Sequence, residues 1–287
     1  MFCCITALGP MTAVEGGWIL DKIVETWSGI EKEEHPSIRV LIAHDIESTS
    51  VEIKGTYNLF DPHPEDGKKL SPRFKGKKAS LYAIEDGLAW GEEFPGTHQI
   101  AIVPDNYNTK ITVNGVDYFG SIFVYRMPEN GTISIVNHVL LEDYLDSLLS
   151  PMYRNEMPQE LLTALAITAR TNAYYQVQNS KSPYWDVDAN QVGYKGTSSS
   201  TAGSPVYQAV KETQFMVLSR NDGSSKAPFP VQWGAYNIGK NPSDQPVYSK
   251  ISILEAESMA KKGMRANTIL AKAFPQTAIE ILKPTAE

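Results

Sequence analysis

The stretch EDYLDSLLSPMYRNEMPQELLTALAITARTNAYY, residues Glu142–Tyr175, decides how this chain is organised. It leads through a polar, proline-containing loop into the most apolar helix candidate of the sequence, Pro158–Tyr175. Apolar residues cover most of the circumference of that helix, which is typical of a buried helix. Pro158 suits its first turn, where a missing N–H costs nothing. Arg170 is its one cation, and a buried guanidinium needs a partner.

The residues before this stretch carry strand and hairpin patterns. Short apolar or alternating runs predict strands at Ser37–Ala43 and Val51–Phe60. The pairs Asn114-Gly115 and Asn130-Gly131 stand between alternating runs and predict β-hairpins that form a meander. The polar segment Asp61–Lys78, rich in Pro, Gly and Lys, is predicted to be a loop.

Long loops and helices are predicted after the central helix. Gln178–Pro205 is rich in Ser and Gly and forms a long loop, a class that often carries function. Ile251–Ala273 is helical, and Gly263 divides it into two helices. The fold class is therefore α+β: a β-rich N-terminal half with hairpins, a buried central helix, long loops and C-terminal helices.

We expect one folded domain after an N-terminal lead-in. The lead-in, residues 1–36, contains an apolar segment about half as long as a membrane span, together with a helix candidate at 18–35. It is interpreted as a partial export signal or a hydrophobic lead-in. The domain covers residues 37–280 and divides into a β-rich part, 37–139, and a part of helices and loops, 140–280.

Composition excludes several classes of function. The net charge of −7 disfavours nucleic acid as the main partner. The two cysteines, Cys3 and Cys4, are neighbours, so they support neither a disulfide framework nor a cysteine zinc site. The five histidines are scattered along the chain. We therefore expect no metal and no cofactor, and no membrane span apart from a possible N-terminal signal or anchor.

The central stretch resembles the SpoIID/LytB family of bacterial cell-wall proteins. EDYLDSLL (Glu142–Leu149) is similar to the family segment E-D-Y-L-x-G-V-V, and ELLTALAITARTNA (Glu160–Ala173) is similar to its helix. NQVGYKG (Asn190–Gly196) is similar to the family's Q-x-Y-x-G motif with one residue inserted. The resemblance extends over roughly residues 37–280. It implies a SpoIID-like fold.

The resemblance also implies peptidoglycan glycan strands as the ligand. Enzymes of this family are lytic transglycosylases, which act on strands stripped of their stem peptides and leave 1,6-anhydro-muramic ends. Related proteins instead enhance or modify amidases, so the alternative is a catalytically impaired peptidoglycan-binding protein or an amidase partner. The implied location is the periplasm or cell envelope, in septal division, sporulation or wall turnover.

The position of the catalytic acid is open. Aligned without gaps, the family's acidic residue falls on Met152, which cannot transfer a proton. The family's E-M-P triplet occurs four residues later, where Glu156 would supply the carboxyl; alternatively, Glu156 only stabilises the start of a helix. The resemblance implies that Arg170 supports the acid or binds a sugar, and that Tyr194 and Lys195 contact the glycan.

Overall fold

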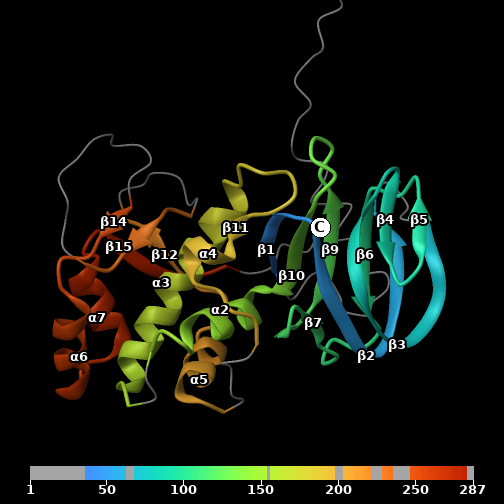
Figure 1. Cartoon of the computed structure of the whole chain (residues 1–287). Helices are drawn as coiled ribbons and strands as arrows, with labels where there is room; N and C mark the ends of the chain where they lie inside the picture. The colour runs from blue at the N-terminus through green and yellow to red at the C-terminus, as the bar shows by residue number, and fades with distance from the viewer. Residues whose placement is uncertain are drawn as a thin grey trace, which may run out of the picture.

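The computed structural model describes residues 36–62, 68–153, 156–197, 203–221, 228–234 and 246–282. The lead-in predicted for residues 1–36, including its export signal and helix, lies outside these residues except for Pro36. The strands β1–β10 lie on one side of the molecule, and the helices lie on the other side together with the short strands β12, β14 and β15 (Figure 1). The predicted α+β class is confirmed.

The strands of the N-terminal part are β1 (Ser37–Ile46), β2 (Ser48–Asp61), β3 (Lys68–Ile84), β4 (Gly87–Trp90), β5 (Glu93–Pro95), β6 (Gln99–Pro104), β7 (Ile111–Val113), β8 (Val116–Tyr118), β9 (Ser121–Arg126) and β10 (Ile133–Leu140). The later elements are α2 (Leu141–Leu149), α3 (Gln159–Gln178), β11 (Val187–Asp188), α4 (Ala189–Val192), α5 (Pro205–Glu212), β12 (Met216–Arg220), β13 (Val231–Gln232), β14 (Val247–Tyr248), α6 (Ile253–Lys261), α7 (Ala266–Ala273) and β15 (Thr277–Ile281).

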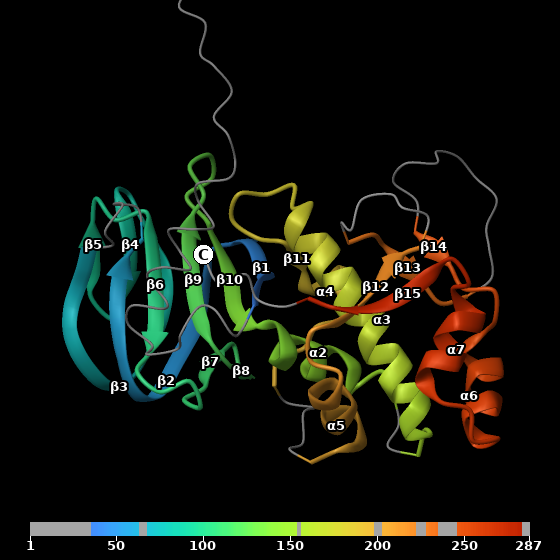
Figure 2. The same ribbon diagram turned by 180° about the vertical axis from the view of Figure 1, so that it is seen from behind.

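The main sheet has the order β11-β1-β10-β9-β6-β2-β3-β4-β5; β7 joins it by pairing with β2, and β8 pairs with β7. Neighbouring strands are antiparallel except β1 and β11, which pair in parallel. That pairing ties the residues after the central helix to the first strand of the chain. It places α4 next to β1, as the view from behind also shows (Figure 2).

The Asn114-Gly115 hairpin is confirmed. It joins β7 to β8, with Val113 opposite Val116. Both turn residues have positive φ, 47° and 83°, as a type I′ turn requires. Asn130-Gly131 also joins two paired strands, β9 and β10, but within a longer connection in which the Met127 N–H donates to the Thr132 carbonyl.

The loop predicted for Asp61–Lys78 was wrong over most of its length. β3 begins at Lys68 and pairs with β2. The pairing runs from Asp61 opposite Lys68 to Ser48 opposite Tyr82. Pro72, Gly76 and the lysines of this segment therefore belong to a long strand. Register shifts interrupt the pairing between Ile53 and Thr56 and again beyond Tyr57, which allows such residues inside a strand.

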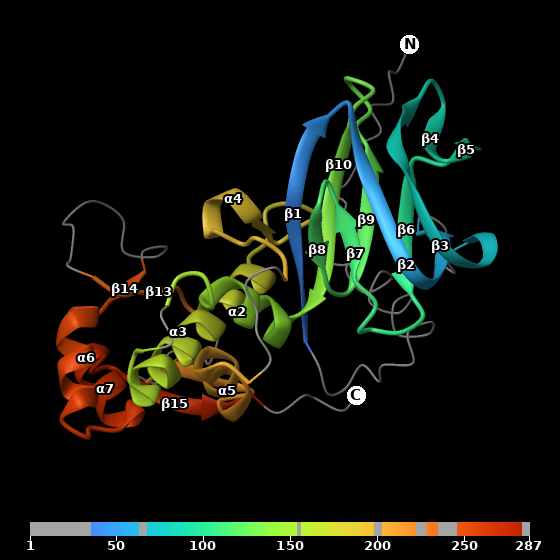
Figure 3. The same cartoon turned by 60° about the horizontal axis from the view of Figure 1, so that its bottom comes forward.

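The central helix lies between two hydrophobic cores. One of its faces, including Leu162 and Ala166, packs with the main sheet and α2. The opposite face, including Leu161, Leu165 and Ile167, packs with α6, α7 and β12. This position explains why α3 is apolar nearly all round, and it confirms the buried helix predicted from the sequence. In Figure 3, α3 lies between the sheet and the pair α6–α7.

The residues on either side of α3 behave partly as predicted. α2 starts directly after β10, so EDYLDSLL is a helix rather than the polar loop predicted there. Pro158 is the N-cap of α3 instead of its first helical residue. The predicted division at Gly263 is confirmed, because α6 ends and α7 begins on either side of it and its φ is 81°.

Candidate functional site

Arg170 forms the central polar contact of the helical part. Its side chain is fully buried and pairs with Glu142 of α2 through two hydrogen bonds, Nε to Oε1 at 2.9 Å and Nη2 to Oε2 at 2.6 Å. The guanidinium also donates to the Val210 carbonyl at 2.9 Å and the Thr213 hydroxyl at 3.1 Å, both at the end of α5, and to the Met216 carbonyl at 3.3 Å. Arg170 thus joins α2, α3, α5 and β12.

Glu156 has a different environment. It is exposed and lies three residues before the first residue of α3. Among the residues that the structure describes, its carboxylate takes part in no hydrogen bond or ion pair, and the partners of Arg170 given above do not include it. A carboxyl that acts first as acid and then as base is usually tuned by burial or by a close partner. The roles predicted for Glu156 and Arg170 stay predictions.

Met152, at the gap-free position of the family's acid, lies against the second motif. Half of its surface is exposed. Its Cε atom would be 3.2 Å from a Cβ placed on Gly193, the αL residue that ends α4. The fold therefore brings the central stretch and the NQVGYKG segment into contact at this position.

Tyr194 is part of the core rather than of the surface. Its ring lies 5.4 Å from that of Tyr144 in α2 and 6.1 Å from that of Tyr118 in β8. Its hydroxyl donates to the Oδ1 atom of the buried Asn137 at 2.8 Å. Burial raises the pKa of Tyr194 well above its ordinary value, so the hydroxyl remains a donor at neutral pH. Lys195, by contrast, is exposed. Glycan contact by either residue stays a prediction.

The Tyr194 hydroxyl gives a stability prediction. Tyr194→Phe removes the donor to Asn137 and leaves a buried amide oxygen without it, so we expect a loss of about 1–3 kcal/mol in the free energy of unfolding. Urea denaturation measures this loss. Tyr82→Phe, at a position where 41% of the side chain is exposed, is the matched control and should change stability little. Equal effects of the two variants would contradict the prediction.

A groove of about 880 Å³ lies beside these motifs. Its walls are the last turn of α3, the segment that follows it, β1, β11 and the end of α4. The lining side chains include His44, Gln176, Lys181, Trp185, Asp186, Asp188 and Gln191. Gln191 and Val192, which both line the groove, directly precede Gly193, the residue in contact with Met152. We call this space the α3–α4 groove.

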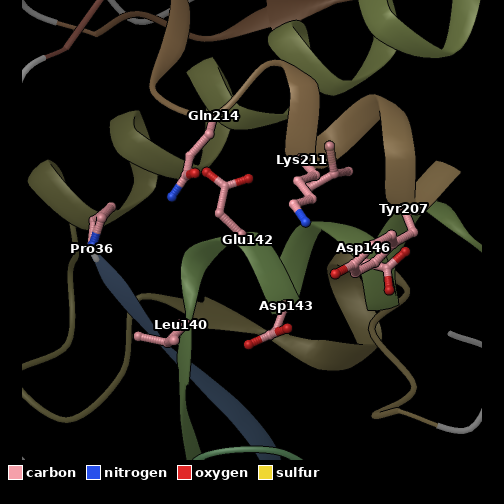
Figure 4. A pocket seen from close by; sticks show the side chains of 9 residues that line it. Pro36, Leu140, Glu142, Asp143, Asp146, Tyr207, Lys211 and Gln214 are labelled. Carbon is pink, nitrogen blue, oxygen red and sulfur yellow. The ribbon is translucent and has the colours of Figure 1, made fainter. Parts of the chain in front are cut away.

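A smaller pocket of about 200 Å³ lies between α2 and α5 (Figure 4). α2 contributes Glu142, Asp143 and Asp146, and α5 contributes Tyr207 and Lys211. Glu142 is held there by Arg170, and the Tyr107 hydroxyl donates to Asp143 at 2.5 Å. Sites for ligands of drug size generally enclose about 300–1,000 Å³, so the α3–α4 groove is the better candidate for a ligand.

Within the described residues, His, Cys, Asp and Glu side chains form no group of three that could hold a metal ion. The helices in this part of the chain include none with the length and apolar character to cross a bilayer.

The architecture and the contact between the two motifs define an α+β protein with a strand-rich half and a buried central helix fixed by an arginine–glutamate pair. The sequence model of the family SpoIID, described as "Stage II sporulation protein", matches residues 129–219. That range contains α2, α3, Met152 and the NQVGYKG segment.

Three curated relatives are similar to the chain. An uncharacterized protein of Chlamydia pneumoniae is 31% identical over 204 residues, which cover 70% of this chain and 73% of the relative. One from Chlamydia muridarum is 31% identical over 189 residues, covering 66% of this chain and 64% of the relative. One from Brachyspira hyodysenteriae is 26% identical over 181 residues, covering 63% and 47%.

The chain belongs to the SpoIID family. This confirms the resemblance found in the sequence and indicates a function related to the cell wall or to sporulation.

The groove itself was not predicted from the sequence. The length of the segment from Gln178 to Pro205 was the available signal, since long loops inside a domain are often functional. Trp185 is the one tryptophan in that segment. Its neighbours in the groove include Leu41 and His44 of β1, which lie far away in the sequence, and no local pattern links them.

Proposed function

We propose that this protein binds peptidoglycan glycan strands in the α3–α4 groove and leaves the glycosidic bond intact. The observation that carries the proposal is the contact between Met152 and Gly193, the residue that directly follows the groove-lining Val192. The two motifs that resemble the family's substrate-binding region meet here, and the side chain at the acid's position is a thioether. A thioether is a weak acceptor and has no proton to donate.

The other carboxylates of the groove have structural partners. Asp186 accepts hydrogen bonds from the side chain of Arg39, Nη2 to Oδ1 at 2.6 Å and Nε to Oδ2 at 3.2 Å. Asp188 caps α4 by accepting from the Asn190 N–H at 2.8 Å. Glycoside cleavage needs a carboxyl positioned on the glycosidic oxygen. These partners favour binding over cleavage.

Glycan cleavage by Glu156 is the second candidate function. The intact E-M-P triplet and the exposure of Glu156 favour it, because an exposed carboxyl is accessible to a long polymer. In that case the protein would be a lytic transglycosylase that acts on strands without stem peptides. An exported location, in the periplasm or cell envelope, is part of both proposals, since the wall lies outside the cytoplasm. An amidase partner stays a prediction.

One experiment separates the two candidates. The protein is incubated with peptide-free glycan strands, the bound fraction is measured by sedimentation, and the soluble products are analysed by mass spectrometry. We expect the protein to sediment with the strands and no 1,6-anhydro-muramic ends to form.

The variant Glu156→Gln removes the carboxylate of the second candidate function. Glu212→Gln, which removes another exposed carboxylate at the end of α5, is its matched control. Anhydro products that form with the wild type and Glu212→Gln, but not with Glu156→Gln, would establish the second candidate in place of the first. Failure of the wild type to sediment with the strands would refute the proposed ligand.

A further inference from the structure

We infer that Trp185 is the stacking platform of a subsite for a neutral, N-acetylated, β-1,4-linked amino sugar in the α3–α4 groove. The inference rests on the proposed function and extends it, since it assigns the part of the groove that recognises the ligand. Four observations support it: how the Trp185 segment is held, which polar groups are available, how the charges are balanced, and how close in the chain the groove lies to the second family motif.

The segment that carries Trp185 is fixed on both sides of the indole. The Trp185 carbonyl accepts from the Ser180 hydroxyl at 2.7 Å. Arg39 donates from its backbone N–H to Asp186 at 2.8 Å and from its Nη1 to the Pro183 carbonyl at 2.5 Å. A binding group held in place before the ligand arrives loses less conformational freedom on binding.

The indole is oriented by aromatic neighbours. Its centroid lies 5.5 Å from the His44 ring at an interplanar angle of 59°, and 6.3 Å from the Tyr184 ring at 33°. Tyr184 in turn lies 4.6 Å from the buried Tyr125 of β9. Trp185 also packs against the buried cluster that contains Leu41. The ring is only partly buried, so it both belongs to the fold and lines the groove.

Polar groups around the indole are available to a ligand. Among the residues the structure describes, the indole N–H of Trp185, the side-chain amides of Gln176 and Gln191 and the ammonium of Lys181 make no hydrogen bond or ion pair with protein groups. Amides both donate and accept hydrogen bonds, as hydroxyl and acetamido groups require. A concave site with an aromatic wall and a few such groups is the usual form of a small-molecule site.

The charged side chains that line the groove together with Trp185 largely balance one another. Arg39 neutralises Asp186 through an ion pair at 2.6 Å. Lys181 and Asp188 carry opposite charges, and Asp188 is engaged at the start of α4. A strongly charged ligand such as a polyphosphate would find no cluster of cations here. A largely uncharged saccharide matches the lining better.

The groove lies close in the chain to the position where the two family motifs meet. Trp185 and Gln191 line the same space, and Gln191 lies two residues before Gly193, which contacts Met152. The subsite that we infer therefore includes a residue of the second family motif.

Tryptophan indole NMR tests the inference with the full chain and the β-1,4-linked tetramer of N-acetylglucosamine. The sequence contains 5 tryptophans, so the ¹⁵N spectrum contains few indole signals, and Trp185→Phe assigns the one of interest. We expect the Trp185 signal to shift on titration. The signals of Trp90 and Trp233 should stay fixed, because their N–H groups donate to Val51 and Thr168 inside the protein. The β-1,4-linked tetramer of glucose, which lacks acetamido groups, should shift the Trp185 signal less.

Variants link the subsite to the polymer. Trp185→Ala should weaken binding of peptide-free glycan strands by about tenfold or more, the usual effect of removing an aromatic anchor. Tyr82→Ala, which removes an exposed aromatic ring from β3, should leave binding unchanged. Unfolding curves show whether Trp185→Ala is folded, and the NMR titration of the wild type does not depend on that variant.

The outcomes distinguish the inference from the proposed function. Strand binding by the wild type, together with a Trp185 signal that does not move, would overturn the subsite and leave the proposed function standing. Equal strand binding by Trp185→Ala and the wild type would do the same. No binding of either the strands or the tetramer would overturn both.

Discussion

Replacing Arg170 with methionine is expected to lower the free energy of unfolding by about 3–5 kcal/mol, the usual cost of removing one partner of a buried ion pair. The substitution leaves the Glu142 carboxylate without its two charge-assisted hydrogen bonds. It also leaves the carbonyls of Val210 and Met216 without this donor. Urea denaturation with a constant dependence on denaturant is the measurement.

A double-mutant cycle identifies the cause of that loss. Arg170→Met combined with Glu142→Leu removes both charges, so the double variant should be more stable than the sum of the single losses predicts. Arg265→Met, which removes an exposed arginine before α7, is the matched control and should cost less than about 0.5 kcal/mol. A loss below about 1 kcal/mol for Arg170→Met would contradict the role of this pair as the link between α2, α3 and α5.

Gly196→Ala is expected to be the other strongly destabilising change, at about 2–4 kcal/mol. Gly196 closes the NQVGYKG segment with a φ of 69°, and a Cβ there would lie 2.4 Å from the Asp117 carbonyl oxygen of β8. That carbonyl also accepts from the Thr197 N–H at 2.7 Å. The clash therefore separates the motif from β8, and thermal or urea unfolding measures its cost.

Gly203→Ala is the matched control for Gly196→Ala. Gly203 has a similar φ of 84°, but no atom of the residues that the structure describes lies within 4 Å of a Cβ placed there. Its substitution should therefore cost only the backbone strain, about 1 kcal/mol. If both substitutions lower the free energy of unfolding by the same amount, the close approach of the NQVGYKG segment to β8 does not contribute to stability.

Local patterns predicted much of the fold. The type I′ turn at Asn114-Gly115 and the division at Gly263 depend on residues that adopt positive φ at low cost. The burial of α3 followed from its apolar circumference. α2 was missed because its polar residues, which include Asp143, Asp146 and Ser147, are weak helix formers. Tyr144, Leu145 and Leu149 stabilise that helix by packing into the core, which a local pattern does not reveal.

The candidate site was less predictable. The sequence suggested a partner for Arg170, but Glu142 lies 28 residues earlier and is brought to it by the packing of α2 against α3. Glycan contact by Tyr194 stays a prediction, and the sequence did not reveal that its side chain packs between Tyr118 and Tyr144. Trp185 became a candidate only when β11 paired with β1 and set it beside His44. Each of these contacts depends on distant parts of the chain.

Family membership supports a broad function, and the geometry of the groove supports a more specific proposal. Membership of the SpoIID family indicates a function related to the cell wall or to sporulation. The Met152–Gly193 contact and the α3–α4 groove support strand binding as the specific proposal. In that proposal the Arg170–Glu142 pair maintains the fold that holds the groove, and Trp185 recognises the sugar.

Calorimetric titration of a peptide-free glycan oligomer of alternating N-acetylglucosamine and N-acetylmuramic acid into the full chain tests the central claim most directly. The account predicts a saturable heat with one oligomer bound per chain, and an oligomer that mass spectrometry recovers intact. The absence of a binding heat, or recovery of the oligomer with 1,6-anhydro ends, would contradict it.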